Sequence, residues 1–439
     1  MNLIKVKQHF SLLLFVILLS LSILPSVQAQ QVPAAVYSRY VTLTTAFTKM
    51  TAQDDSQRKE KSEANAGLIK GIAAFYQQQR EYSVERQLLA SNLQLQVLLM
   101  QQDYQQGYQV VSQLLDLSLA LEQQLSFQQL AAQLAAQSDS YKTSKNKSWQ
   151  QATQHLKAWF TLVDNLNDKQ RIEYNITTEQ EAGNAALLAQ GYYLQGQLAS
   201  ALAPAKRAYK LLPKNESYLQ LLLALLQRLE RHSALNKHLE IAVVDFPNSK
   251  DYWERLAYSY LTLEQHKSAL STLAITRNQG LLTTQGYRVL ASLYLQQQQP
   301  RLAAHVYLEG ADKKLLKQDN AYFKGLSNAW LMARERSKAL AVLAQAEAAG
   351  IKLAKQAQQQ AQLLYLEARW SEAELAYAAL LDHGAKGKDQ KTLLMTDKWR
   401  FLLAVSQIEQ GKKSQAKDNL LLLQTKQYQG YSKGWMAQL

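Results

Sequence analysis

One stretch of 34 residues constrains the fold of this chain more than any other feature. Residues 250–283 read KDYWERLAYSYLTLEQHKSALSTLAITRNQGLLT. Large apolar and small residues recur in it at spacings of three and four, which places them on one face of a helix. These positions are Trp253, Leu256, Ala257, Tyr260, Ala269 and Leu273. The alanines allow two helices to approach closely, and because one helical hairpin cannot bury its apolar face, copies of it must flank this stretch.

The spacing matches the tetratricopeptide repeat, W-x2-L-G-x2-Y followed by A-x3-F, with alanine and leucine at the glycine and phenylalanine positions. Pro213 and Pro247 lie 34 residues apart, which is the period of that repeat, and proline at this place ends a helix. Seven units in the same register begin near Ala182, Glu216, Lys250, Thr284, Asn320, Ala354 and Asp397. We therefore predict an all-α fold, a tetratricopeptide-repeat (TPR) solenoid in which antiparallel helix pairs form a right-handed superhelix.

Composition supports a helical chain and excludes some chemistry. Only 16 glycines and 6 prolines occur in 439 residues, so helix breakers are scarce. Because no cysteine is present, the chain can form no disulfide, no thiolate metal site and no cysteine nucleophile.

Residues 1–29 are predicted to be an export signal peptide. Lys5 and Lys7 precede an apolar run of 15 residues, and a small-residue cleavage site ends at Ala29. The run is shorter than the roughly 20 residues that span a bilayer. We therefore expect cleavage after Ala29 and a soluble mature protein, located in the periplasm if the source is a Gram-negative bacterium. An uncleaved membrane anchor is the alternative, and no later stretch reaches transmembrane length.

Two segments are expected after the signal peptide. Residues 30–181 are interpreted as two or three diverged helical hairpins and a capping helix, with helices over 34–50 and 64–79. Residues 182–439 are interpreted as the regular TPR array, closed by a C-terminal capping helix. Terminal repeats are expected to be atypical because one of their faces meets water.

Basic residues outnumber acidic ones, with a formal net charge of +14. The excess is densest over residues 386–433, which hold ten Lys or Arg against four acids. This segment could meet an acidic partner or an anionic envelope polymer; ordinary solvated helix faces are the alternative. Nucleic acid is not expected as a partner, because basic and aromatic residues are not interleaved as single strands require.

No motif predicts catalysis, a metal or a cofactor. The seven histidines lack metal-ligand spacing. Residues 411–414 (GKKS) lack the earlier glycine of a phosphate-binding loop. Residues 430–434 (GYSKG) match G-x-S-x-G, but no strand precedes them and no acid and histidine follow, so a flexible tail is predicted there. We expect a protein that is not an enzyme.

Several stretches go beyond the generic repeat and resemble the periplasmic TPR proteins associated with TonB-ExbB-ExbD energy-transduction systems. They are LKAWFTLVDN (156–165), LLAQGYYLQGQLASALAPAKRAY (187–209), KDYWERLAYSY (250–260), QGLLTTQGYRVLASLYLQQQQPRLAAHVYLEG (279–310) and NAWLMARERSKAL (328–340). The resemblance extends from about Leu88 to the C-terminal GWMAQL. It implies a non-enzymatic periplasmic helper of a complex that energises outer-membrane uptake of iron chelates, with TonB-ExbB-ExbD components as partners.

Resemblance to other TPR proteins also implies a binding groove made by positions 2, 5, 9, 12 and 13 of the first helix of each unit. The candidates in this register are Gln190, Tyr193, Gln220, Arg228, Glu254, Tyr258, Arg288, Ser292, Lys324 and Asn328. Their mixed polar and aromatic character suits an extended peptide better than an apolar helix. The alternative function is an envelope adaptor, enzyme or regulator acting on peptidoglycan, which an acidic pocket would favour.

Overall fold

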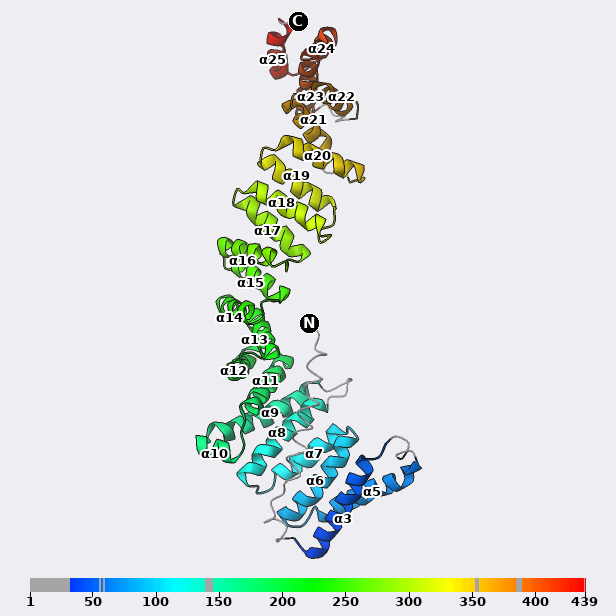
Figure 1. Cartoon of the computed structure of the whole chain (residues 1–439), viewed down its shortest axis with the longest axis vertical. Helices are drawn as coiled ribbons and strands as arrows, with labels where there is room; N and C mark the ends of the chain where they lie inside the picture. The colour runs from blue at the N-terminus through cyan, green and yellow to red at the C-terminus, as the bar shows by residue number, and fades with distance from the viewer. Residues whose placement is uncertain are drawn as a thin grey trace. The chain divides into compact units, whose positions relative to one another are not determined.

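The computed structural model describes residues 32–54, 57, 60–138, 145–351, 355–383, 389–437 and 439. Of these described residues 79% are helical, and they form 22 helices and no strand. The predicted all-α repeat architecture is confirmed by these helices, which follow one another as antiparallel pairs (Figure 1). The signal peptide expected over residues 1–29 lies outside the described residues. Among the described helices, none is long and apolar enough to cross a membrane.

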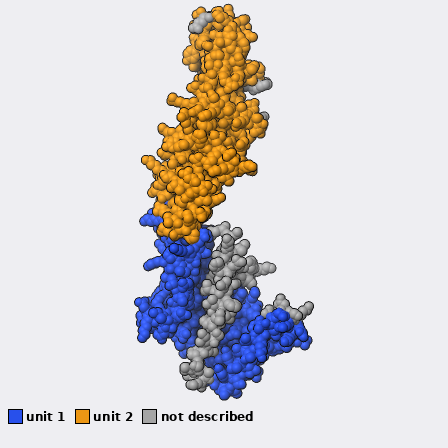
Figure 2. Space-filling view, viewed as in Figure 1, with its two compact units in different colours: residues 1–238 blue, residues 239–439 orange. Residues whose placement is uncertain are grey.

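The chain separates into two compact units, residues 1–238 and residues 239–439, which we call unit 1 and unit 2 (Figure 2). The division falls inside one helix, α14 (His232–Asp245). The change from diverged to regular repeats expected at residues 181 and 182 is a boundary in sequence pattern, and it stays a prediction.

Unit 1 contains the diverged helices and the first regular pair. Its helices before α14 are α3 (Ala34–Thr51), α5 (Ser62–Gln79), α6 (Val84–Met100), α7 (Tyr104–Leu115), α8 (Leu121–Gln137), α9 (Lys145–Asp164), α10 (Asp168–Glu173), α11 (Thr178–Leu194), α12 (Leu198–Leu211) and α13 (Glu216–Arg228). Consecutive helices from α5 to α9 pack on one another, and α9 packs on α11. The short α10 interrupts this order, so it is an insertion between two packed helices.

Unit 2 continues the series with helix pairs, and its first six helices after α14 are 13 residues long each. Its helices after α14 are α15 (Lys250–Thr262), α16 (His266–Asn278), α17 (Thr284–Gln296), α18 (Pro300–Asp312), α19 (Asn320–Met332), α20 (Arg336–Ala348), α21 (Gln356–Leu366), α22 (Trp370–His383), α23 (Gln390–Ile408), α24 (Lys413–Leu421) and α25 (Lys426–Met436). From α11 and α12 to α23 and α24 there are seven pairs, as the repeat count predicts.

A residue in the left-handed backbone conformation closes the first helix of each of these seven pairs. Four of them follow one another at intervals of 34 residues: Gly196, Glu230, Glu264 and Gln298. Arg334, Ala368 and Gly411 hold the same place in the later pairs. After Gln298, for example, the N–H of Gln299 donates to the carbonyl of Tyr294 at 2.8 Å, a bond that ends a helix when the intervening residue is left-handed. The repeat period is therefore visible in the backbone itself.

Side chains at these turns should affect stability, because only glycine adopts a left-handed conformation without steric cost. Gln298 has φ of 55°. Replacing it by valine is expected to lower the free energy of unfolding by about 1 to 3 kcal/mol, since a β-branched residue is strained there. Replacing it by glycine should leave stability unchanged or raise it by about 1 kcal/mol. Urea unfolding of the three proteins measures this, and equal midpoints would contradict it.

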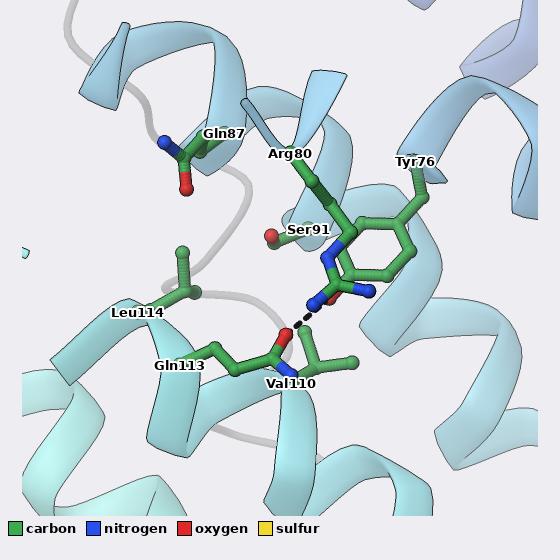
Figure 3. Close-up of a pocket in the computed structure, with 7 residues that line it drawn as sticks. All are labelled: Tyr76, Arg80, Gln87, Ser91, Val110, Gln113 and Leu114. Carbon is green, nitrogen blue, oxygen red and sulfur yellow. Dashed lines mark hydrogen bonds between the residues drawn. The ribbon is translucent and has the colours of Figure 1, made fainter. Parts of the chain in front are cut away.

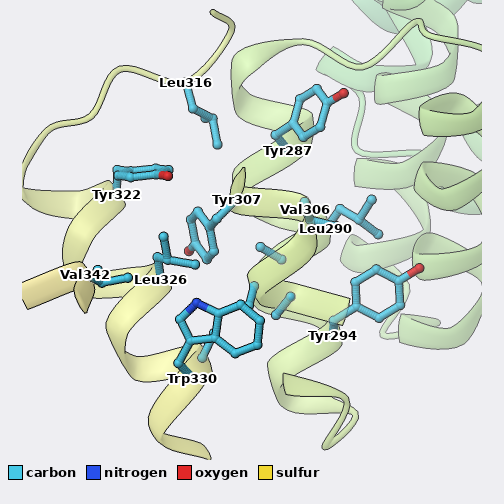
Figure 4. Close-up of a cluster of buried hydrophobic side chains, with 14 of the residues drawn as sticks. Tyr287, Leu290, Tyr294, Val306, Tyr307, Leu316, Tyr322, Leu326, Trp330 and Val342 are labelled. Atoms are coloured by element: carbon cyan, nitrogen blue, oxygen red, sulfur yellow. The ribbon is translucent and has the colours of Figure 1, made fainter. Parts of the chain in front are cut away.

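The core of unit 2 lies between the helices of successive pairs. Ala257 and Ala269 are 1% and 0% exposed, so the predicted close contact between the two helices of that unit is confirmed. Further along, aromatic and aliphatic side chains of α17, α18 and α19 interleave, with Tyr307 edge-on to Tyr322 (Figure 4). Trp253, expected on the core face, is only half-buried, and its indole N–H donates to the carbonyl of Pro247 at 2.7 Å.

The C-terminal end differs from the prediction in two respects. The last pair begins at Gln390, not near Asp397, which is buried within α23 and accepts hydrogen bonds from the N–H groups of Gln424 and Thr425. Residues 430–434 lie inside α25 and not in a flexible tail. Asp397 anchors the residue before α25, and Tyr428 of α25 packs against Phe401 of α23, which explains why this helix is held in place.

Candidate functional site

The left-handed turns give a common reference for the predicted groove residues of unit 2. The left-handed residues that end α15, α17 and α19 are Glu264, Gln298 and Arg334. The predicted residues that lie ten positions before them are Glu254, Arg288 and Lys324, in that order. Those that lie six positions before them are Tyr258, Ser292 and Asn328. Within each helix the two positions are four apart, so they lie one turn from each other on the same face. The structure thus brings six of the ten predicted residues to equivalent places on α15, α17 and α19. We call these six residues the first-helix face.

Contacts between neighbouring first helices show that α15 and α17 lie side by side. The Glu254 carboxylate accepts hydrogen bonds from the N–H and the hydroxyl of Thr283, the residue that caps α17. Gly286 allows this approach, because a Cβ atom there would lie 2.6 Å from a carboxylate oxygen of Glu254. Glu254 therefore joins two repeats and is only partly available to a ligand.

Arg288 plays the same joining role between α17 and α19. Its guanidinium pairs with Asp319 at 3.0 Å, and Asp319 caps α19 by accepting from the N–H of Tyr322. That backbone hydrogen bond, with the nearby Arg288 charge, lowers the pKa of Asp319. Arg288, a predicted groove residue, is half-buried and its charge is paired, so it is only partly available to a ligand.

The other members of the face are open to solvent. Tyr258 is 36% exposed, and Ser292, Lys324 and Asn328 are exposed as well. One turn further along each helix the face continues with three exposed residues that are not among the predicted groove positions. They are Thr262, Gln296 and Met332. Each lies four residues after Tyr258, Ser292 or Asn328, so the same helical spacing could have predicted that it belongs to this face.

The remaining four predicted residues belong to unit 1. Tyr193 and Arg228 meet across α11 and α13, with the guanidinium carbon 5.3 Å from the ring centroid. Gln220 donates to Glu216 one turn away at 3.2 Å, and Gln190 is half-buried. Arg228 and Tyr193 thus form a cation–π pair, which is a stabilising contact between helices as well as a surface feature.

In the part of the chain that the structure describes, no three histidine, aspartate or glutamate side chains lie close enough together to hold a metal ion. Ser432 of the G-x-S-x-G match is buried within α25 and donates to the carbonyl of Gln429 at 2.9 Å. The hydroxyl of this serine is hydrogen-bonded to the backbone of its own helix, and it is not positioned as a nucleophile.

Comparison with known proteins gives structural matches only. No protein-family model matches the chain, and a search of curated proteins finds no relative. Among solved structures, a tetratricopeptide repeat protein from Parabacteroides merdae is 14% identical with a TM-score of 0.32, covering 55% of this chain and 91% of that one. MamA is 14% identical with a TM-score of 0.31, covering 40% and 98% of the two chains. The apo form of RapI is 13% identical with a TM-score of 0.32, covering 86% and 99%. At these scores the matches carry no conclusion about partners, and the fold assignment rests on the helix pairs described above.

Proposed function

We propose that this protein is a non-enzymatic scaffold that binds an extended polypeptide segment on the first-helix face of unit 2. The observation that carries the proposal is the alignment of exposed polar side chains in equivalent positions of α15, α17 and α19. Stacked repeats commonly use such extended surfaces for binding. Hydroxyl and carboxamide groups at Ser292 and Asn328 can donate to and accept from a peptide backbone, while the Tyr258 ring offers apolar contact area.

The charges on this face suggest the direction in which a segment would lie. Asp251 of α15 is paired with Arg255, so Glu254 is the carboxylate that α15 adds to this face, whereas Lys324 on α19 forms no ion pair with any described residue. A segment with a basic residue over α15 and an acidic residue over α19 would be complementary to this arrangement. Between the two charged ends, α17 presents the neutral Ser292 and Gln296, while its Arg288 is already paired with Asp319.

We further propose that the protein works in the periplasm and assists a TonB-ExbB-ExbD system. The signal-peptide pattern at residues 1–29 supports export, and the resemblance of the middle repeats supports the TonB association. A role in peptidoglycan metabolism is the alternative. It would be favoured by an acidic pocket, whereas the pocket beside Arg80 in unit 1 is lined by neutral and basic side chains.

Deleting the gene tests the TonB association. We expect slow growth on a ferric chelate as the only iron source and normal growth on free iron, because only the chelate requires energised outer-membrane uptake. Expression of the whole chain should restore growth. A form that lacks residues 1–29 should not, since it would stay in the cytoplasm. Normal growth of the deletion strain on the chelate would remove the TonB association and leave peptide binding to be decided separately.

A further inference from the structure

A small pocket opens in unit 1 where α5, α6 and α7 meet (Figure 3). Its volume is about 80 Å³, and its lining includes Tyr76, Arg80, Ser91, Val110, Gln113 and Leu114. A water molecule occupies about 30 Å³ in the liquid, so the pocket can take a group the size of a few waters. This volume fits a carboxylate with a methyl group.

The polar side of the pocket is arranged to donate hydrogen bonds. The hydroxyl of Tyr76 donates to the side-chain carbonyl of Gln113 at 3.0 Å, which leaves the NH₂ group of that amide available as a donor. The Arg80 guanidinium lies 5.8 Å from the Tyr76 ring centroid and donates to Gln77 at 3.2 Å. No acidic side chain lines the pocket, and Arg80 has no ion-pair partner among the described residues.

The inner side of the pocket is buried and partly apolar. Val110 and Leu114 of α7 are 7% and 3% exposed, and Ser91 of α6 is 2% exposed. A cation and an amide donor at the rim therefore face an apolar wall that carries one hydroxyl. This combination is suited to a group with a negative charge at one end and a small apolar substituent beside it.

We propose that this pocket binds a small carboxylate, namely the C-terminal carboxylate of a polypeptide that ends in a small residue such as alanine. Arg80 pairs with the carboxylate oxygens, the NH₂ group of Gln113 donates to one of them, and the terminal methyl packs on Val110 and Leu114. Capture of a terminal carboxylate is an established mode of peptide recognition, and arginine is suited to it because its planar fork can donate two parallel hydrogen bonds. The pocket lies in unit 1, so the proposal stands independently of the first-helix face.

Ligand-observed NMR titration of the whole mature chain tests the proposal with two probes that differ in one group. N-acetyl-L-alanine is expected to bind with a dissociation constant of roughly 1 mM, as its size allows. N-acetyl-L-alaninamide, which lacks the negative charge, should bind at least about tenfold more weakly. Acetate is the third probe: if it binds as tightly as N-acetyl-L-alanine, the source is a free small carboxylate and the C-terminal assignment is wrong.

Two matched variants locate the binding. Arg80→Gln should weaken N-acetyl-L-alanine binding at least about tenfold, because the charge that pairs with the carboxylate is lost. Lys70→Gln removes the same charge from an exposed position of α5, the helix that Arg80 follows, and should leave binding unchanged. Circular dichroism must show equal melting temperatures for the two variants. Equal affinity for the acid and the amide, no saturable binding of either probe, or unchanged binding in Arg80→Gln would each overturn the proposal.

Discussion

Replacing Glu181 by alanine is expected to lower the free energy of unfolding of this protein by about 3 to 5 kcal/mol. The Glu181 side chain is 9% exposed and pairs with two arginines, Arg171 of α10 and Arg207 of α12. Its carboxylate accepts from the guanidinium of Arg207 at 2.7 and 2.9 Å. Truncation would leave two partly buried cations without this partner, and such a loss costs far more than the loss of an exposed ion pair.

Asp164, the other carboxylate near this cluster, should offset only part of the stability lost in Glu181→Ala. Asp164 of α9 also pairs with Arg207, whose guanidinium lies 4.4 Å from the Phe160 ring centroid, but Asp164 is half exposed. Arg171 has no second carboxylate among its described contacts, although it also donates to the carbonyl of Val163 at 3.1 Å. We therefore expect the region around α10 to open first in the variant.

Urea unfolding followed by tryptophan fluorescence measures the effect, because Trp159 is fully buried in the same part of unit 1. Glu179→Ala is the matched control: it removes the same charge from an exposed position of the same helix and should change stability by no more than about 0.5 kcal/mol. Equal losses in the two variants would show that the buried cluster does not hold α9 to α12 together.

Replacing Tyr258 by alanine and Lys324 by glutamate together should weaken binding of the partner segment by about 100-fold. Truncating an interface tyrosine that is a binding hot spot costs about 2 kcal/mol, and a reversed charge adds repulsion. Both side chains are exposed, and neither is in an ion pair with another described residue, so the melting temperature should hardly change. Arg288 is left intact, because its loss would disturb the cap of α19 and confuse folding with binding.

The measurement is isothermal titration with the purified periplasmic segments of TonB and of ExbD, the proposed partners. The matched control is Ile275→Ala with Lys267→Glu, which makes similar changes at exposed positions of the second helix α16. Binding that is weakened equally by both double variants would remove the assignment to the first-helix face. Absence of binding by the unaltered protein would remove these two partners.

Much of the fold could be predicted because repeat spacing alone determines which residues are buried. Ala257, Ala269 and the helix pairs follow from spacings of three and four and from the 34-residue period. The same periodicity places Tyr258, Ser292 and Asn328 in one row, since residues at equal places in equal helices face the same way. Local pattern was sufficient for these features.

Interactions between repeats could not be predicted in this way. Arg288 forms an ion pair with Asp319, which is 31 residues away in the sequence, and Arg207 forms one with Asp164, which is 43 residues away. Each charge looks like an ordinary solvated residue in the sequence, because its partner is close only after the helices have packed. The pocket beside Arg80 was missed for the same reason, since α5, α6 and α7 each contribute only part of its lining.

Site-specific photo-crosslinking in living cells tests the central claim, peptide binding on the first-helix face, most directly. Benzoylphenylalanine is placed singly at Tyr258, Ser292 or Asn328, and as controls at Asn278, Asp312 or Ala348, which are exposed and occupy equivalent places at the ends of second helices. We predict that light produces the same protein adduct from all three first-helix positions and none from the controls. The account is contradicted if the first-helix positions give no adduct, or if the controls give the same one.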